Sequence, residues 1–119
     1  MAKIKLYLLQ SKLLFDIARL IIYAHKLNYA VTLGRGFVSP EANRAEGGKE
    51  HSLHLLKLGQ DLCFFKDGIY LRDSQELAIF GRWWKDQGSD HAWGGDFKDS
   101  RGRLVGDGNH FSIKYGGMK

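Results

Sequence analysis

Apolar residues recur at helical spacing through the first quarter of the chain, and this pattern restricts the possible folds more than any other feature. The spacing predicts one long amphipathic helix over residues 4–27. The apolar stripe consists of Leu6, Leu9, Leu13, Ile17, Leu20, Ile21 and Ala24. The opposite side is assigned to the polar residues Lys5, Lys12, Asp16, Arg19 and Lys26. A stripe of this length must be buried, so we expect core rather than a partner-binding face.

Short apolar or alternating runs predict strands at residues 29–33, 59–65, 68–71 and 110–115. Asp67-Gly68 is a strong signal for the turn that joins the second and third of these strands. A second helix is expected over residues 74–87, with Asp73 or Ser74 as its N-cap. The elements together predict an α+β fold in which helices pack against a small antiparallel sheet.

Two segments carry loop signals instead. Residues 39–50 contain Pro40 and the Gly47-Gly48 pair, which predict a loop with at most one helical turn. Residues 91–108 are rich in Gly and Asp and predict an ordered loop.

Composition is that of one ordinary globular domain covering residues 1–119, and we expect a monomer. The only cysteine, Cys63, excludes an intrachain disulfide, and its apolar neighbours favour a buried thiol. The formal charge of +5 favours an anionic partner such as nucleic acid, anionic lipid or an envelope polymer. The charges are scattered without a dense basic run, so no specific nucleic-acid site is predicted.

The N-terminal segment is interrupted by Gln10, Lys12, Asp16 and Arg19, and no small-residue cleavage site follows it. It therefore resembles neither a signal peptide nor a transmembrane helix.

Two clusters of polar residues could carry chemistry. The first is Ser52-Leu53-His54, followed seven residues after the histidine by Asp61, and the second is Asp107-Gly108-Asn109-His110. Two imidazoles and one carboxylate form a three-ligand set of the catalytic zinc type, which leaves a position for water. Spacing alone also allows Asp61 to be an exposed residue at a strand start.

Asp107 precedes His110 by three residues, and a turn at Gly108-Asn109 can bring both side chains to one side. A carboxylate there could exchange protons with the attacking water and the leaving amine. Taken alone, the same residues also fit a plain turn.

In this order, the two clusters resemble the signature of the zinc D-Ala-D-Ala carboxypeptidase family, which includes phage endolysins that cut L-alanyl-D-glutamate bonds. The tract Trp93-Gly94-Gly95-Asp96-Phe97 is similar to one that phage members carry between the two clusters. The resemblance implies a hedgehog/D-Ala-D-Ala-peptidase-like fold and one zinc ion per chain, held by His54, Asp61 and His110, with Asp107 as general base and acid. It also implies that Ser52 supports the first ligand or the substrate and that Trp93 and Asp96 line the cleft, with structural packing as the alternative for Trp93 and Asp96.

One position departs from this pattern. Many relatives carry an arginine before the first ligand, where this chain has Val38, and Arg35 or Arg44 could substitute from nearby. The resemblance implies hydrolysis of peptidoglycan stem peptides by an endolysin-type endopeptidase. Such an enzyme would be made in the host cytoplasm and act on the cell wall after release. A D-Ala-D-Ala carboxypeptidase, a non-catalytic wall-binding module and a virion structural protein remain alternatives.

Overall fold

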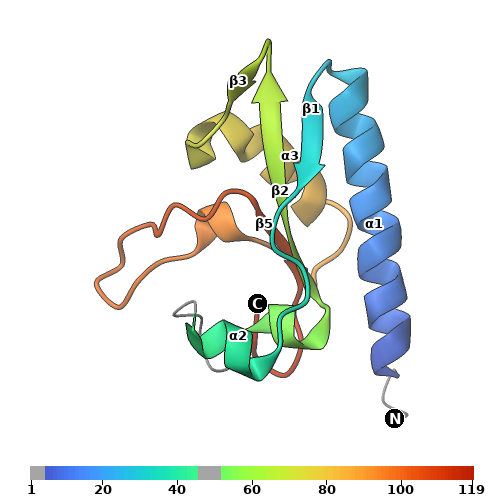
Figure 1. Ribbon diagram of the computed structural model, residues 1–119, viewed down its shortest axis with the longest axis vertical. Coiled ribbons are helices and arrows are strands. Elements are labelled where there is room, and N and C mark those ends of the chain that lie inside the picture. The colour runs from blue at the N-terminus through green and yellow to red at the C-terminus, as the bar shows by residue number, and fades with distance from the viewer. Residues whose placement is uncertain (1–4, 46–51) are drawn as a thin grey trace.

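The computed structural model describes residues 5–45 and 52–119, and it has the α+β architecture that the sequence predicts (Figure 1). An antiparallel sheet lies at its centre, with the long helix α1 along one side. The helices are α1 (Leu6–Lys26), α2 (Pro40–Ala45) and α3 (Ala78–Lys85), with the short 3-10 helices η1 (Leu53–Leu56), η2 (Ser74–Leu77) and η3 (Gly94–Asp96). The strands are β1 (Ala30–Leu33), β2 (Gly59–Lys66), β3 (Ile69–Tyr70), β4 (His91–Trp93) and β5 (His110–Ile113).

The strand order is β1-β2-β5-β4, and β3 pairs with the end of β2. Strand β2 is long enough to pair with two partners along its length, β1 near its end and β5 at its start. Its turn into β3 occurs at Asp67 and Gly68, both with positive φ, as a tight hairpin turn requires. Strands β2 and β5 therefore bring together two segments separated by nearly fifty residues.

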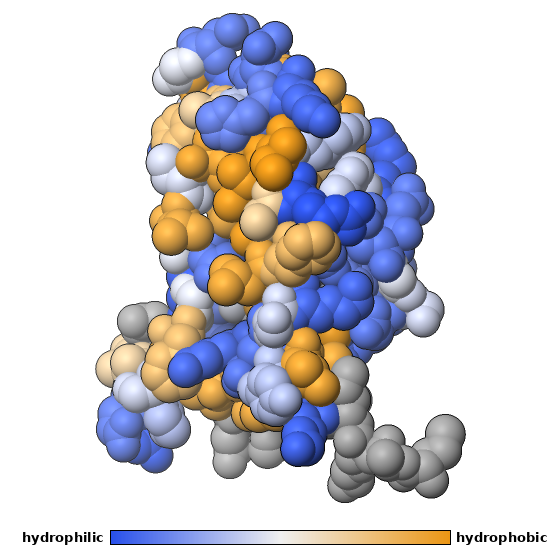
Figure 2. Space-filling view, turned by 90° about the vertical axis from the view of Figure 1, so that its right-hand side faces the viewer, coloured by the Kyte–Doolittle hydropathy of each residue, from blue (hydrophilic) through white to orange (hydrophobic). Residues whose placement is uncertain are grey.

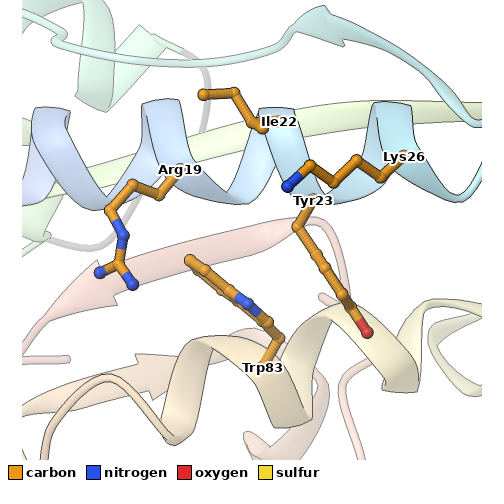
Figure 3. Close-up of a pocket in the computed structure, with 5 residues that line it drawn as sticks. All are labelled: Arg19, Ile22, Tyr23, Lys26 and Trp83. Atoms are coloured by element: carbon orange, nitrogen blue, oxygen red, sulfur yellow. The ribbon is translucent and has the colours of Figure 1, made fainter.

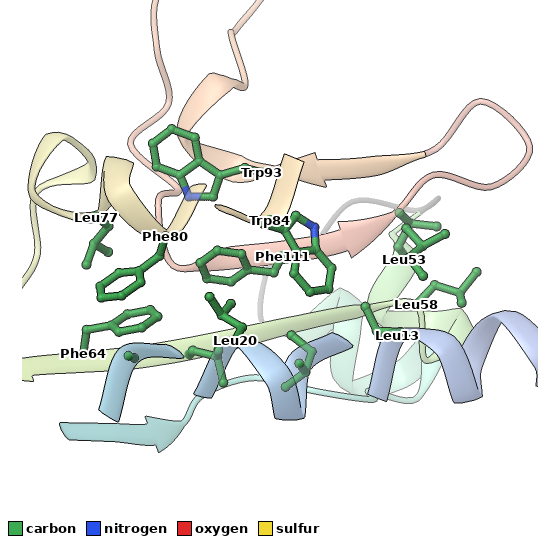
Figure 4. Packing of buried hydrophobic residues seen from close by; sticks show 14 of the residues in the cluster. Leu13, Leu20, Leu53, Leu58, Phe64, Leu77, Phe80, Trp84, Trp93 and Phe111 are labelled. Atoms are coloured by element: carbon green, nitrogen blue, oxygen red, sulfur yellow. The ribbon is translucent and has the colours of Figure 1, made fainter. Parts of the chain in front are cut away.

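The hydrophobic core fills the space between the helices and one face of the sheet (Figure 4). Strand β2 contributes Leu62 and Phe64 to it, and the Phe64 ring stacks on Phe80 of α3 with 4.5 Å between centroids. Strand β5 contributes Phe111 and Ile113. Since side chains alternate along a strand, the residues between these positions lie on the other face of the sheet.

Cys63 is one of the alternate residues of β2, and it is only partly buried. The expectation of a buried thiol is therefore wrong. The apolar run around Cys63 indicated burial, but the residue occupies the face of the strand opposite the core.

The structure contains more regular elements than the sequence predicted. Helix α2 has six residues, longer than the single turn expected after Pro40, and the predicted 91–108 loop begins with strand β4 and η3. The second predicted helix starts as the 3-10 turn η2, capped by the Asp73 side chain, before α3 begins. The Gly47-Gly48 loop lies outside the described residues, as does residue 4, the predicted start of the first helix.

Helix α1 buries most of the predicted stripe, but the assignment of Asp16 to the polar side is wrong. Asp16 is 1% exposed, and its carboxylate contacts Lys12, Arg19 and the His91 ring. Both ring nitrogens of His91 contact carboxylates, Asp16 at 2.8 Å and Asp90 at 2.9 Å. The network fastens α1 to the start of β4. Among the described residues, no helix is both long and apolar enough to span a membrane.

Burial opposes ionisation of Asp16, but hydrogen bonds from His91 and Lys12 outweigh it and hold its pKa below the ordinary value. A lowered folded-state pKa contributes stability above about pH 4, which is lost as the pH falls further.

We expect Asp16→Asn to destabilise the protein by about 2 kcal/mol near neutral pH, because it removes a buried carboxylate that accepts hydrogen bonds from Lys12, Arg19 and His91. Asp90→Asn is the matched control, since Asp90 contacts the other nitrogen of His91 but its side chain is 45% exposed. It should cost less than about 1 kcal/mol. Urea unfolding at several pH values measures the free energy of unfolding of both variants. As the pH falls into the acid range, Asp16→Asn should lose less of this free energy than the unmodified protein does. Equal losses in the two variants would contradict the assignment.

Candidate metal centre

Asp61 and His110 are brought together by strand pairing. They are direct partners in the antiparallel register between β2 and β5, and both project from the face of the sheet opposite the core. The Asp61 Oδ1 atom lies 3.1 Å from His110 Nδ1. Two polar residues far apart in sequence thus form an adjacent pair.

His54 reaches the same point from the 3-10 turn η1. The Ser52 hydroxyl caps this turn by accepting a hydrogen bond from the His54 backbone N–H at 3.2 Å. The His54 Nδ1 atom lies 2.8 Å from the Gly36 carbonyl oxygen. A carbonyl can only accept, so Nδ1 carries the proton and Nε2 presents its lone pair. That nitrogen lies 3.4 Å from Asp61 Oδ1.

The three side chains fit a zinc site by donor type and by spacing. One ligand atom from each of His54, Asp61 and His110 lies within 4.8 Å of the other two. Zinc–nitrogen and zinc–oxygen bonds of about 2.0–2.2 Å place neighbouring ligands of a tetrahedral site roughly 3.3 Å apart. The two separations from Asp61 Oδ1, 3.1 and 3.4 Å, bracket this value. The group can therefore hold a divalent metal ion.

The second nitrogen of His110 gives independent support. Its Nε2 atom is buried and has no hydrogen-bond partner among the described residues. A buried polar atom without a partner costs free energy. The ring nevertheless holds its orientation with Nδ1 toward Asp61, and it packs against the Phe97 ring at 5.5 Å between centroids. The orientation is the one that a metal ligand needs.

The charges of the site are strongly coupled. Burial would raise the pKa of Asp61, but hydrogen bonds from His110 and His54 lower it to about 2. For His54, burial opposes protonation, yet the hydrogen bond and charge of Asp61 and the Gly36 carbonyl raise its pKa above the ordinary value. The Arg35 charge acts in the opposite direction on His54. Asp61 is therefore an ionised ligand across the physiological range.

Asp107 lies on the turn that leads directly into His110. Its carbonyl oxygen accepts the His110 backbone N–H at 3.0 Å. Gly94 packs closely against this carbonyl, and an added Cβ would stand 2.1 Å from it, so only glycine fits there. The Ser74 hydroxyl accepts the Gly108 N–H, and the Trp93 indole donates to the Gly108 carbonyl at 2.7 Å. Ser74 of η2, Trp93 of β4 and the close packing of Gly94 in η3 thus hold the turn in place.

The other predicted site residues are two that are partly or fully buried, Arg35 and Trp93, and two that are exposed, Arg44 and Asp96. Arg35 is partly buried, donates to the Asn43 side chain at 3.1 Å, and lies near enough to affect His54. Arg44 is exposed on the last turn of α2. Asp96 is half exposed and paired with Lys85 at 2.7 Å. Trp93 is 7% exposed and acts on the Gly108 turn from within the core.

Sequence reasoning missed residues that act through the backbone or through close packing. The Gly36 carbonyl orients His54, but a carbonyl oxygen leaves no trace in a sequence. Gly59 and Gly94 each provide space beside His110, where an added Cβ would lie 3.0 and 2.8 Å from its side chain. Gly94 lies within the recognised Trp-Gly-Gly-Asp tract, which was the available signal.

Among solved structures with a similar fold is the crystal structure of the L-Ala D-Glu endopeptidase ChiX of Serratia marcescens. The TM-score is 0.59 and the sequence identity 23%, over 83% of this chain and 78% of that chain. No family model matches the chain, and no curated protein matches it significantly. The similarity shows a shared fold.

The support of the Gly108 turn by Trp93 generates a prediction. We expect Trp93→Phe to weaken zinc binding about tenfold, because it removes an outer hydrogen bond that positions the turn before His110. The matched control is Trp84→Phe, since Trp84 also donates from a buried indole to a carbonyl, that of Ser112. Competitive zinc titration should find Trp84→Phe within about twofold of the unmodified protein. Equal weakening in both variants would show that only general stability matters.

The charge coupling generates a second prediction, on pH. In the metal-free protein, the lowered pKa of Asp61 contributes stability above about pH 4, and the raised pKa of His54 contributes it below about pH 6.5. The His54 contribution is lost as pH rises through its raised pKa. Zinc requires the neutral imidazole, so apparent affinity should rise with pH, by up to about tenfold per unit below that pKa. Thermal unfolding across a range of pH, with and without zinc, measures the pH dependence of stability and of zinc binding. A rise in melting temperature on adding zinc that does not change with pH would contradict the ligand assignment.

Proposed function

We propose that this chain is a single zinc peptidase domain that hydrolyses an amide bond in peptidoglycan stem peptides. The observation that carries the proposal is the convergence of His54 Nε2, Asp61 Oδ1 and His110 Nδ1 on one point. When bound there, zinc supplies a Lewis acid that polarises a carbonyl group and makes water more acidic.

Asp107 is the proposed general base and acid. The proposal is supported by its position in the turn that leads into His110, a turn that the packing of Gly94 and the Trp93 hydrogen bond restrict. A carboxylate there takes a proton from the attacking water and passes it to the leaving amine.

Arg35 is the proposed electrostatic partner of the substrate. Its backbone carbonyl accepts the Asp61 N–H at 2.8 Å, its charge opposes the rise in the pKa of His54, and its guanidinium is oriented by Asn43. A guanidinium held in a fixed orientation beside the ligands can stabilise negative charge on the scissile carbonyl oxygen. Arg35 thus takes the role that the residue at Val38 cannot, since Val38 is buried and apolar. Exposed Arg44 would meet more distant parts of the substrate.

The substrate class rests on the resemblance of the two sequence clusters and on the shared fold. A solved structure with a similar fold is that of an L-Ala D-Glu endopeptidase. The net charge of +5 suits an enzyme that works among anionic envelope polymers. A phage or prophage endolysin-type endopeptidase is the activity that these observations favour most.

A D-Ala-D-Ala carboxypeptidase is the second candidate, and the position of Arg35 is the observation that favours it. A cation beside the ligand set could bind the terminal carboxylate that such a substrate carries. Digestion of purified muropeptides, with mass spectrometry of the new termini, separates the two activities. Release of D-alanine identifies the carboxypeptidase, and new glutamate amino termini identify the endopeptidase.

Substitution of the ligands and of the proposed base tests the mechanism directly. We expect His110→Ala to lose both stoichiometric zinc, measured by elemental analysis, and hydrolysis. Asp107→Ala should keep zinc and lose about 10²–10⁴-fold in turnover. His25→Ala is the matched control for a histidine substitution, since His25 is exposed near the end of α1. It should change neither property. Full turnover by Asp107→Ala would remove that residue from its role.

A further inference from the structure

The outer face of α1 carries an apolar surface that the fold does not use. Five large hydrophobic side chains on this helix are 45–71% exposed. They are Tyr7, Leu8, Leu14, Phe15 and Ile22. Their spacing places them along one side of the helix, with the small exposed residues Ser11 and Ala18 between them. Figure 2 shows apolar side chains gathered down this side of the molecule. We call this surface the outer α1 face.

A row of cations runs beside the outer α1 face. Lys5, Lys12, Arg19 and Lys26 are exposed and follow one another at intervals of seven residues, so they align along the helix. The only acidic residue within α1, Asp16, is buried. The exposed charge of this helix is therefore positive, with Lys12 and Arg19 also paired to the buried Asp16 carboxylate and Lys5 and Lys26 outside that network.

A shallow pocket of about 230 Å³ lies where the cation row meets α3 (Figure 3). It is lined by Arg19, Ile22, Tyr23, Lys26 and Trp83. The Arg19 guanidinium lies 5.4 Å from the centroid of the Trp83 ring, and Tyr23 stacks on the same indole at 5.7 Å. The pocket thus combines two cations with amphipathic aromatic rings, the residue types that are enriched at the boundary between lipid and water.

The other side of the outer α1 face is also bordered by a cation beside an aromatic ring. A second pocket lies between α1 and the segment that follows β1, and Leu14 and Phe37 line it together with Lys57. Phe37 is 57% exposed, and the Lys57 ammonium lies 5.3 Å from the centroid of its ring. Cations therefore border the apolar strip on both sides.

We propose that the outer α1 face docks on an anionic lipid bilayer, with its apolar residues in the interfacial region and its cations on the lipid phosphates. An amphipathic helix with aromatic and leucine residues beside lysines and arginines has the properties of an interfacial helix. Charge complementarity selects this occupant over a second copy of the chain, which would bring two like-charged cation rows together. This docking is independent of the peptidase proposal.

Docking through α1 would determine the direction in which the metal centre faces. Helix α1 packs on the core face of the sheet, whereas Asp61 and His110 project from the other face. A protein bound to a bilayer through α1 would therefore present its metal centre away from the lipid. In this orientation a membrane-bound molecule faces the polymer that covers the membrane.

Vesicle binding tests the proposal with the full chain. We expect binding to vesicles of phosphatidylcholine with phosphatidylglycerol and none to phosphatidylcholine alone, with affinity falling as salt rises. Leu14→Gln/Phe15→Gln should weaken vesicle binding at least about tenfold, through lost apolar contact. The matched control is Ile69→Gln/Leu104→Gln, since these two side chains are 65% and 62% exposed elsewhere on the surface. The control should bind as the unmodified protein does.

A second pair of variants separates the cation row from the general charge. Lys5→Gln/Lys26→Gln should weaken binding about tenfold or more, because each cation near an anionic surface contributes to the affinity. Lys98→Gln/Arg101→Gln removes the same charge from exposed positions away from α1 and should have little effect. None of these residues belongs to the metal centre, so zinc content and hydrolysis of soluble muropeptides should stay unchanged in all four variants.

Three results would overturn the proposal. The first is the absence of binding to anionic vesicles at low salt. The second is equal weakening by the α1 variants and their controls, which would assign binding to diffuse charge. The third is a dimer, seen by sedimentation equilibrium, that Leu14→Gln/Phe15→Gln dissociates, which would make a second copy the occupant of this face.

Discussion

The antiparallel register between β2 and β5 is the constraint on which the metal centre depends. It places Asp61 directly opposite His110, and a slip of one residue would send one of the two side chains into the core. The register is held by burial on the other face, where Phe64 and Phe111 belong to one cluster. The free energy that positions the ligands therefore comes mainly from apolar packing beneath them, and the polar pair adds little to it.

One face of the sheet packs into the hydrophobic core and the other carries the metal ligands. The turns at the ends of β5 connect the two faces. Trp93 and Trp84 both lie in the core, and each donates its indole N–H to a carbonyl in or beside β5. Core packing is dense and transmits displacement, so a change around the Trp93 indole, which bonds to the ligand turn itself, is felt there. A buried tryptophan can thus belong to the site without touching substrate, and this is our physical interpretation of the Trp-Gly-Gly-Asp tract.

The sequence predicted the parts of the structure that local patterns determine. The helical stripe of α1, the Asp67-Gly68 turn and the strand that carries Asp61 each follow from the spacing of neighbouring residues. The meeting of His54, Asp61 and His110 was reached by resemblance, since spacing alone left Asp61 ambiguous. Asp16 was misassigned because its partner His91 lies 75 residues away, and a helical pattern contains no such information. The three-residue strand β4 was missed because so short a run shows no period.

Helix α1 shows why a hydrophobic pattern predicts burial only in part. Its inner stripe and its outer face are both apolar, separated on one side by the row of lysines and arginine. Helical spacing identifies the larger stripe and predicts that the remaining residues are exposed to solvent. It gives no reason for the apolar residues Leu14 and Phe15 at positions where polar residues would also fit. Folding does not require these side chains, since the core is complete without them. Scattered exposed apolar residues are ordinary, but a continuous strip bordered by one sign of charge calls for a partner of the opposite sign. The helix thus has two separate functions, holding the sheet on one side and offering a binding surface on the other.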